Sequence, residues 1–193
     1  VNHPYLRKYH DAPTVPSDYE LSLEKEENAS KWILGNPQAF CNTNDKEILS
    51  QVLNDYDRET NDFFRWRLTY SQVQLSELVS RRTGIDFGTI NGLIPLRRGS
   101  SGRIIRLKIA GSKRSMIIGK ELEIRKALSE SHLYSSAIVF DKVDNGGEVF
   151  FRLNGAGWGH GVGLCQIGAA VMGAKGYDYK AILSHYFHEA VLM

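Results

Sequence analysis

The sequence has no run of about 18 consecutive apolar residues, the length that a membrane-spanning helix needs. It also has little charge bias, because 24 Lys and Arg against 22 Asp and Glu leave a net charge of +2, too small to indicate nucleic-acid binding by itself. Neither a repeat nor a low-complexity tract is present. The chain starts at Val1 with no methionine and no signal-like apolar segment, so we expect a processed or trimmed product. What remains is a 193-residue chain, 42% hydrophobic, that can bury a core as one domain or a domain plus a subdomain.

The chain has only two cysteines, Cys41 and Cys165. They could pair, but they lie far apart in the sequence, and nothing near either one has the spacing of a metal-binding motif. Cys41 follows Phe40 and is more easily interpreted as a small buried hydrophobic residue. We therefore predict no metal site and no cofactor from these residues.

Hydrophobic periodicity and turn signals predict an α+β fold, in which antiparallel β-hairpins form a sheet and helices pack against it. Residues 1–30 contain three prolines and an acidic cluster, which favours an extended N-terminal arm. Residues 31–193 are expected to form the domain, and residues 66–135 are a candidate subdomain within it.

Local signals predict most of the elements. Ser71 and Gln74 have the spacing of a capping box, which begins a helix that ends near Gly84. The run Asp144-Asn145-Gly146-Gly147 is a strong turn signal between strands at 136–140 and 148–153. The other expected elements are a helix at 45–53 capped by Asn44, strands at 66–70, 89–96, 102–109 and 115–118, helices that start at Gly119, at Leu164 and after Asp178, and an edge strand at 190–193.

Residues 154–168 are the most unusual stretch, because six of these fifteen residues are glycine. Ordering so many glycines costs conformational entropy, so we expect them to be required for positive φ angles or for the close approach of another group. We predict a strand-to-helix turn in which His160 and Gln166 meet a ligand. Trp158 either offers its flat apolar face to that ligand or packs in the core beneath the turn.

Several chemistries fit such a turn. Its spacing matches neither the dinucleotide fingerprint nor a P-loop, which argues against a nucleotide site. Cys165 near a helix N-terminus and His160 upstream could form a nucleophilic pair, but no orienting acid is evident, and a small buried thiol beside a hydrogen-bonded histidine is favoured. Metal binding by His160, Cys165, His185 and His188 is a further alternative to packing or exposed histidines. Carbohydrate binding fits the composition best.

The residues from Gly157 to Ala169 read GWGHGVGLCQIGA and resemble the signature of the SpoIID/LytB family, which commonly reads GWGHGVGMSQ(Y/W)GA. Pro4-Tyr5-Leu6 with Asp11 is similar to the PYL…D segment of that family, and Ser101-Gly102-Arg103 is similar to its S-G-R strand. Residues 176–187 are similar to its closing helix, G-x-x-Y-x-x-I-L-x-H-Y-Y. The resemblance spans most of the chain, and the glycine-histidine motif is its most specific part.

The resemblance implies a protein of the bacterial cell wall. Family members are lytic transglycosylases, which cleave the bond between N-acetylmuramic acid and N-acetylglucosamine to a 1,6-anhydro product, or enhancers of a cell-wall amidase. It further implies an extracytoplasmic location, in the periplasm or cell envelope, with peptidoglycan glycan strands and a cell-wall amidase as partners and with no nucleic acid. The substrate contacts that it implies are Ser101, Trp158, His160, Gly161, Cys165, Gln166 and Tyr186.

Two departures from the family pattern bear on activity. Cys165 and Ile167 stand where many members have a serine and an aromatic residue, and a thiol hydrogen-bonds more weakly than a hydroxyl. The catalytic glutamate of the family lies in an earlier helix, and neither that helix nor the cysteine- and histidine-bearing stretch that binds zinc in some members has a match here. We therefore expect the C-terminal portion of a catalytic region, which carries one wall of a glycan groove, lacks the catalytic acid and is inactive alone. The alternative is a non-catalytic glycan-binding module or an amidase activator.

Overall fold

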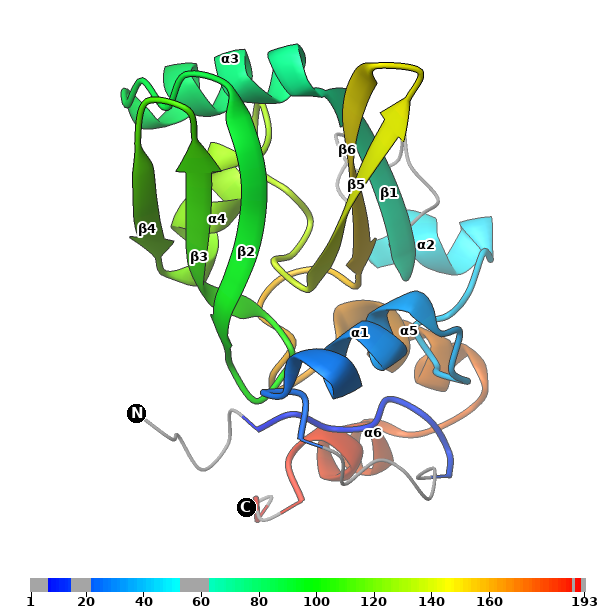
Figure 1. Ribbon diagram of the computed structural model, residues 1–193. Helices are drawn as coiled ribbons and strands as arrows, with labels where there is room; N and C mark the ends of the chain where they lie inside the picture. Colours follow the sequence, from blue (N-terminus) through cyan, green and yellow to red (C-terminus); the bar gives the residue numbers. More distant parts are fainter. Residues whose placement is uncertain (1–6, 15–21, 53–62, 189, 192–193) are drawn as a thin grey trace. The chain divides into compact units, whose positions relative to one another are not determined.

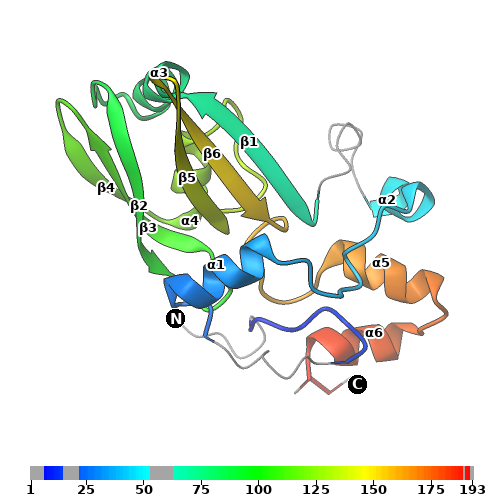
Figure 2. The same ribbon diagram turned by 45° about the vertical axis from the view of Figure 1, so that its right-hand side comes forward.

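The computed structural model describes residues 7–14, 22–52, 63–188 and 190–191 (Figures 1 and 2). These residues form six helices and two antiparallel three-stranded sheets, which confirms the expected α+β fold. The helices are α1 (Glu26–Leu34), α2 (Lys46–Val52), α3 (Gln72–Thr83), α4 (Glu121–Ala127), α5 (Gln166–Ala174) and α6 (Tyr179–Tyr186). The strands are β1 (Arg65–Ser71), β2 (Ile90–Arg98), β3 (Ile104–Gly111), β4 (Ser115–Gly119), β5 (Ile138–Asn145) and β6 (Glu148–Ala156).

The chain forms two compact units that alternate along the sequence. The sheet unit consists of residues 22–36 and 65–160, and the helical unit consists of the described residues within 1–21, 37–64 and 161–193. The chain passes from the first unit to the second between His160 and Gly161, in the middle of the glycine-rich turn. In the described part of either unit, no helix is both long and apolar enough to cross a bilayer.

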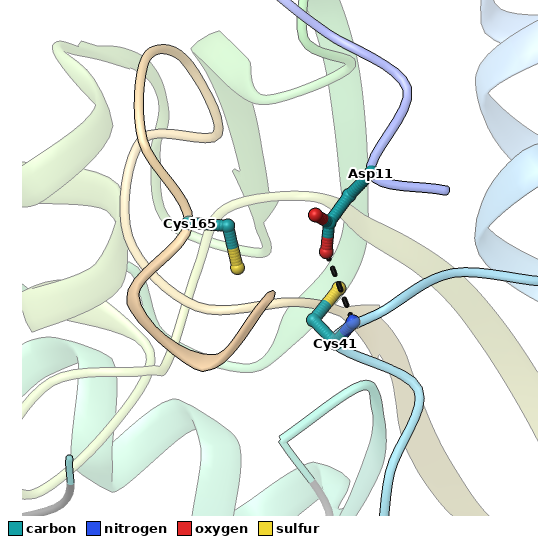
Figure 3. Close-up of side chains that lie close together, drawn as sticks. All are labelled: Asp11, Cys41 and Cys165. Atoms are coloured by element: carbon teal, nitrogen blue, oxygen red, sulfur yellow. Dashed lines mark hydrogen bonds between the residues drawn. The ribbon is translucent and has the colours of Figure 1, made fainter. Parts of the chain in front are cut away.

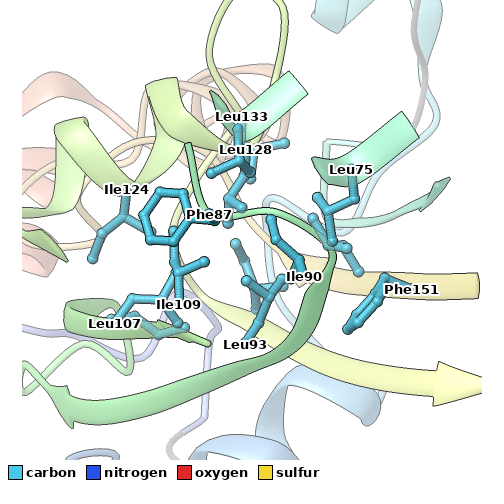
Figure 4. Packing of buried hydrophobic residues seen from close by; sticks show 14 of the residues in the cluster. Leu75, Phe87, Ile90, Leu93, Leu107, Ile109, Ile124, Leu128, Leu133 and Phe151 are labelled. Carbon is cyan, nitrogen blue, oxygen red and sulfur yellow. The ribbon is translucent and has the colours of Figure 1, made fainter. Parts of the chain in front are cut away.

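The sheet unit contains both sheets, with strand orders β1-β6-β5 and β2-β3-β4. Strand β6 is central in its sheet and pairs Gly155 with Trp66 on one side and with Ile138 on the other. Helix α4 packs on the sheet that contains β3, and side chains from α3, α4 and both sheets fill one apolar core (Figures 1 and 4). Strand β6, which leads into the glycine-rich turn, is thus anchored by two neighbouring strands and by the core.

Local capping and turn chemistry explains where these elements begin and end. The hydroxyl of Ser71 accepts from Gln74 N and the Gln74 side chain accepts from Ser71 N, so the predicted capping box is confirmed. Gly84 then ends α3 with a left-handed backbone, φ 71°. Between β5 and β6, the Asp144 carboxylate accepts from Gly147 N at 2.8 Å, as expected for the predicted hairpin turn.

Three local expectations are wrong. Helix α1 starts at Glu26, so residues 26–30 are helical and not part of an extended arm. At the start of α2, the carboxylate of Asp45, and not Asn44, accepts from the backbone N–H groups of Glu47 and Ile48. Part of the edge strand expected at 190–193 lies outside the described residues, and Ala190 and Val191 are not in a strand.

The helical unit has a small apolar core formed mainly by Phe40, Val171, Met172 and Tyr186. Helix α5 contacts both α2 and α6 in this unit. Two side-chain caps set the helix starts: Cys165 Sγ accepts from Gly168 N, and Asp178 Oδ1 accepts from Ala181 N, the latter as predicted. Helix α5 therefore begins directly after the glycine-rich turn and has its first turn in a packed environment.

Candidate functional site

The glycine-rich turn is folded so that every second residue has a left-handed backbone. The φ angles of Gly157, Gly159, Gly161 and Gly163 are 64°, 65°, 68° and 70°. Residues with a Cβ adopt this region only with strain, and glycine adopts it freely. The positive φ angles expected from the sequence are confirmed, and they explain why the glycines recur at alternate positions.

Two side chains of the sheet unit hold the carbonyl groups of the turn. Ser101 Oγ donates to the carbonyl of His160 at 2.8 Å, and Arg103 Nε donates to the carbonyl of Gly159 at 3.2 Å. Arg103 is buried and also donates to the Ser101 carbonyl at 2.9 Å. The segment with the S-G-R pattern therefore clamps the turn and fixes its backbone without help from a ligand.

Three aromatic rings, those of Trp66, Tyr134 and Trp158, contact one another in a row near the turn. Trp66 is buried and donates through Nε1 to the Gly157 carbonyl, and its ring meets Tyr134 edge-on at 5.8 Å between centroids. Tyr134 in turn contacts Trp158 at 5.5 Å. Trp158 is half-buried, while the next side chain, His160, is exposed. The ring contact with Tyr134 agrees with packing, and the ligand contact of Trp158 stays a prediction.

In the helical unit, the turn continues into α5. Gly163 N donates to the carbonyl of Arg7 at 3.0 Å, and Cys165 Sγ caps the helix at 3.5 Å from Gly168 N. Gln166 is exposed at the first helical position, and Gly161 is half-buried. An exposed amide at a helix start can hydrogen-bond a polar ligand, and the ligand contact of Gln166 stays a prediction.

The structure brings together three side chains that the sequence did not connect: Asp11, Cys41 and Cys165 (Figure 3). Asp11 accepts from Cys41 N through Oδ2 at 2.9 Å and from the Tyr186 hydroxyl through Oδ1. Both cysteines are free thiols, although they are neighbours. Cys41 is half-buried, and its backbone N–H donates to the Asp11 carboxylate.

The surroundings of this cluster shift three titrating groups. The hydrogen bond with Cys165, burial and nearby negative charge raise the pKa of the Cys41 thiol. Burial, followed by the charge of Asp11, raises the pKa of Tyr186 well above its usual value. Burial lowers the pKa of His185, although the negative charge of Asp11 opposes this. At neutral pH these groups are therefore a thiol, a phenol and a neutral imidazole.

The seven expected contact residues divide between the units. Ser101, Trp158 and His160 belong to the sheet unit, and Gly161, Cys165, Gln166 and Tyr186 belong to the helical unit. Two of them lie deep: Ser101 is 7% and Tyr186 is 1% exposed. Ser101 Oγ donates to the His160 carbonyl, and the Tyr186 hydroxyl donates to the Asp11 carboxylate, while their contacts with substrate stay predictions. Sequence reasoning missed the clamp formed by Arg103 and the ring contact of Tyr134, and only Arg103, in the S-G-R segment, carried a signal.

Two glycines in α5 provide a matched test of the packing around Asp11. A Cβ at Gly168 would lie 2.3 Å from Asp11 Oδ1 and 2.4 Å from the Tyr186 hydroxyl, whereas a Cβ at Gly173 has no neighbour within 4 Å. Gly173→Ala should raise stability by about 1 kcal/mol through helix propensity. Gly168→Ala has the same propensity gain but should lower stability by about 1 kcal/mol, because overpacking costs about 2 kcal/mol. Urea unfolding of both variants checks this, and equal midpoints would contradict it.

A family model described as a domain of unknown function (DUF8618) matches residues 1–163. The chain belongs to this family. The match includes all of the sheet unit and ends within the glycine-rich turn, at Gly163. The chain is also similar to an uncharacterized protein of Brachyspira hyodysenteriae (strain ATCC 49526 / WA1), with 41% identity over 66 residues. That alignment covers 34% of this DUF8618 chain and 17% of the relative.

Proposed function

We propose that this chain contributes a glycan-contacting wall to a protein that acts on peptidoglycan. The observation that carries the proposal is the turn itself: alternate glycines with positive φ, clamped at their carbonyls, beside a half-buried Trp158 and an exposed His160. The resemblance of residues 157–169 to the SpoIID/LytB signature supports it. The same resemblance favours an extracytoplasmic location for the protein.

The residues at the turn suit a sugar chemically. The half-buried Trp158 has a flat apolar ring on which a pyranose can stack. His160, exposed in the same unit, offers a polar group for hydroxyl and N-acetyl groups, and Gln166 is a further exposed polar side chain at the start of α5. Glycines without a Cβ let a rigid polysaccharide approach the backbone; Gly159, for example, has no atom within 4 Å of the place where a Cβ would be.

The reaction that fits this proposal is lytic cleavage between N-acetylmuramic acid and N-acetylglucosamine. A carboxylic acid protonates the leaving glycosidic oxygen and then, as a carboxylate, accepts the proton of the 6-hydroxyl as that oxygen attacks C1, which yields the 1,6-anhydro product. No acidic residue of this chain matches the catalytic glutamate of the family. In the proposed enzyme the acid is therefore contributed from outside these 193 residues, while the turn binds and orients the glycan.

His160→Ala provides the direct test. Loss of one exposed polar contact should weaken binding of the chain to purified peptidoglycan by about 5-fold, since a hydrogen bond contributes on the order of 1 kcal/mol. Co-sedimentation with wall sacculi measures it. His132→Ala, which removes an exposed histidine elsewhere in the sheet unit, is the control and should bind like the wild type. No binding by the wild-type chain, or equal binding by His160→Ala, would contradict the proposal.

The alternative is a binding module or amidase activator, and the unmatched acid is what favours it. Two assays separate it from the enzyme. The whole protein should release anhydro-muropeptides from purified wall if it is a transglycosylase. If it instead releases none but accelerates a cell-wall amidase on the same substrate, the activator is correct.

A further inference from the structure

Three metal-binding side chains converge in the helical unit from three separate segments of the chain. Asp11 lies in the segment 7–14, Cys41 lies before α2, and Cys165 caps α5. One carboxylate oxygen and the two sulfur atoms all lie within 4.8 Å of one another. Figure 3 shows the carboxylate and both thiols directed toward a common space. This group forms only in the folded chain, because its members are remote in sequence.

The neighbours of Asp11 position its carboxylate and leave it able to bind a cation. Among the described residues, Cys41 N donates to one oxygen and the Tyr186 hydroxyl to the other, and a carboxylate oxygen has a second lone pair available. His185 Nε2 lies 4.0 Å from Asp11 Oδ1. This nitrogen is buried and has no hydrogen-bond partner among the described residues. A buried polar nitrogen nearly always has a hydrogen-bond partner or binds a ligand or an ordered water.

The distances suit a small tetrahedral ion. Zinc binds sulfur at about 2.3 Å and nitrogen or oxygen at about 2.0 Å, which places tetrahedral ligands roughly 3.3 to 3.8 Å apart. Ligand atoms within 4.8 Å of one another therefore need only small side-chain movements to meet one ion. The 4.0 Å between Nε2 and Oδ1 needs a similar adjustment at His185.

The chemistry of the donors selects the metal. Two thiolates with a carboxylate and an imidazole suit zinc, whereas calcium and magnesium prefer oxygen ligands only. We propose that Asp11, Cys41 and Cys165 bind one Zn²⁺ ion, with His185 Nε2 at the fourth position. Binding releases both thiol protons to solvent, and the ion offsets two of the three negative charges of the two thiolates and the carboxylate.

Of the residues expected to contact glycan, Cys165 is also a ligand of this site, whereas Trp158, His160 and Gln166 are not. Its ligands are not those of the cysteine- and histidine-bearing stretch that binds zinc in some SpoIID/LytB proteins, because that stretch has no match in this chain. The ion would join the segment 7–14, the turn at Cys41 and the first residue before α5. It would thereby fix the point at which the glycine-rich turn ends.

Cobalt substitution tests the site. The chain, purified with a thiol reductant that does not bind metals, should take up one equivalent of Co²⁺ and show a thiolate-to-cobalt charge-transfer band with intense visible bands of tetrahedral cobalt. One equivalent of Zn²⁺ should displace it. Cys41→Ser and Cys165→Ser should each lower the affinity by at least about 100-fold, and His185→Ala by about 10-fold or more.

The controls separate this site from the glycan proposal. His160→Ala should bind Co²⁺ like the wild type, while Cys41→Ser should still sediment with peptidoglycan; circular dichroism establishes that each variant is folded. A reduced, folded wild-type chain that shows no charge-transfer band overturns the proposal. So does a band that survives in both cysteine variants. Isolation of the chain only as a Cys41–Cys165 disulfide that resists reduction in the folded state also overturns it.

Discussion

Gly155→Ala should lower the free energy of unfolding of the sheet unit by about 3 kcal/mol, at the upper end of ordinary overpacking effects. A Cβ at this position would lie 2.1 Å from the indole of Trp66. Trp66 is buried and pairs with Gly155 from the neighbouring strand β1. The indole cannot simply move away, because its Nε1 holds the Gly157 carbonyl and its ring contacts Tyr134. Urea unfolding followed by circular dichroism measures the loss.

Gly92→Ala is the matched control, because it also adds a methyl group to a strand of the sheet unit. There the new Cβ would have its nearest neighbours at 3.9 Å, an ordinary contact distance. Alanine is more favourable than glycine within a strand by roughly 0.5–1 kcal/mol, so this variant should be as stable as the wild type or slightly more stable. If both variants unfold at the same urea concentration, Trp66 does not require a glycine opposite it.

Elements with strong local signals were predictable from the sequence. The helix that begins at Ser71 has reciprocal side-chain and backbone hydrogen bonds, which depend only on residues three apart. The hairpin at Asn145 and Gly146 is likewise decided by a few adjacent residues that tolerate or support the turn. The glycines of the turn belong to the same class, since their positive φ angles are a property of each residue by itself.

Features that depend on distant residues were not predictable. Helix α1 has Lys25 at its N-cap with no side-chain hydrogen bond, so no start signal marked it, and burial of Ala29 and Ile33 supports it instead. The sequence around Asp11 or Cys41 likewise does not indicate that the two residues are neighbours, because their proximity results from the tertiary packing of the helical unit. The family resemblance pointed to Ser101 and Tyr186, but their hydrogen-bond partners, the His160 carbonyl and the Asp11 carboxylate, could be found only in the folded structure.

Arg98→Met should cost about 3 kcal/mol of stability, because Arg98 is a buried cation with a complete set of partners. Its side chain is 1% exposed and forms a bidentate pair with Glu26 of α1, at 2.7 Å and 2.6 Å. It also donates to the carbonyls of Gly102 and Ile138, both at 2.8 Å. Methionine keeps much of the volume but removes the Arg98 hydrogen bonds to both carbonyls and to Glu26. The midpoint of urea unfolding, with an unchanged slope, measures this cost.

Arg97→Met is the control for this second substitution, since it removes the same charge one residue earlier in β2. Arg97 is exposed, so its replacement should change stability by less than about 0.5 kcal/mol. Glu26→Gln should fall between the two, because an amide still offers one acceptor to the guanidinium and the half-exposed position admits water. Added salt should not remove the difference between the two arginine variants, because buried pairs are screened weakly. Similar losses in Arg97→Met and Arg98→Met would show that net charge, and not the buried network around Arg98, determines the effect.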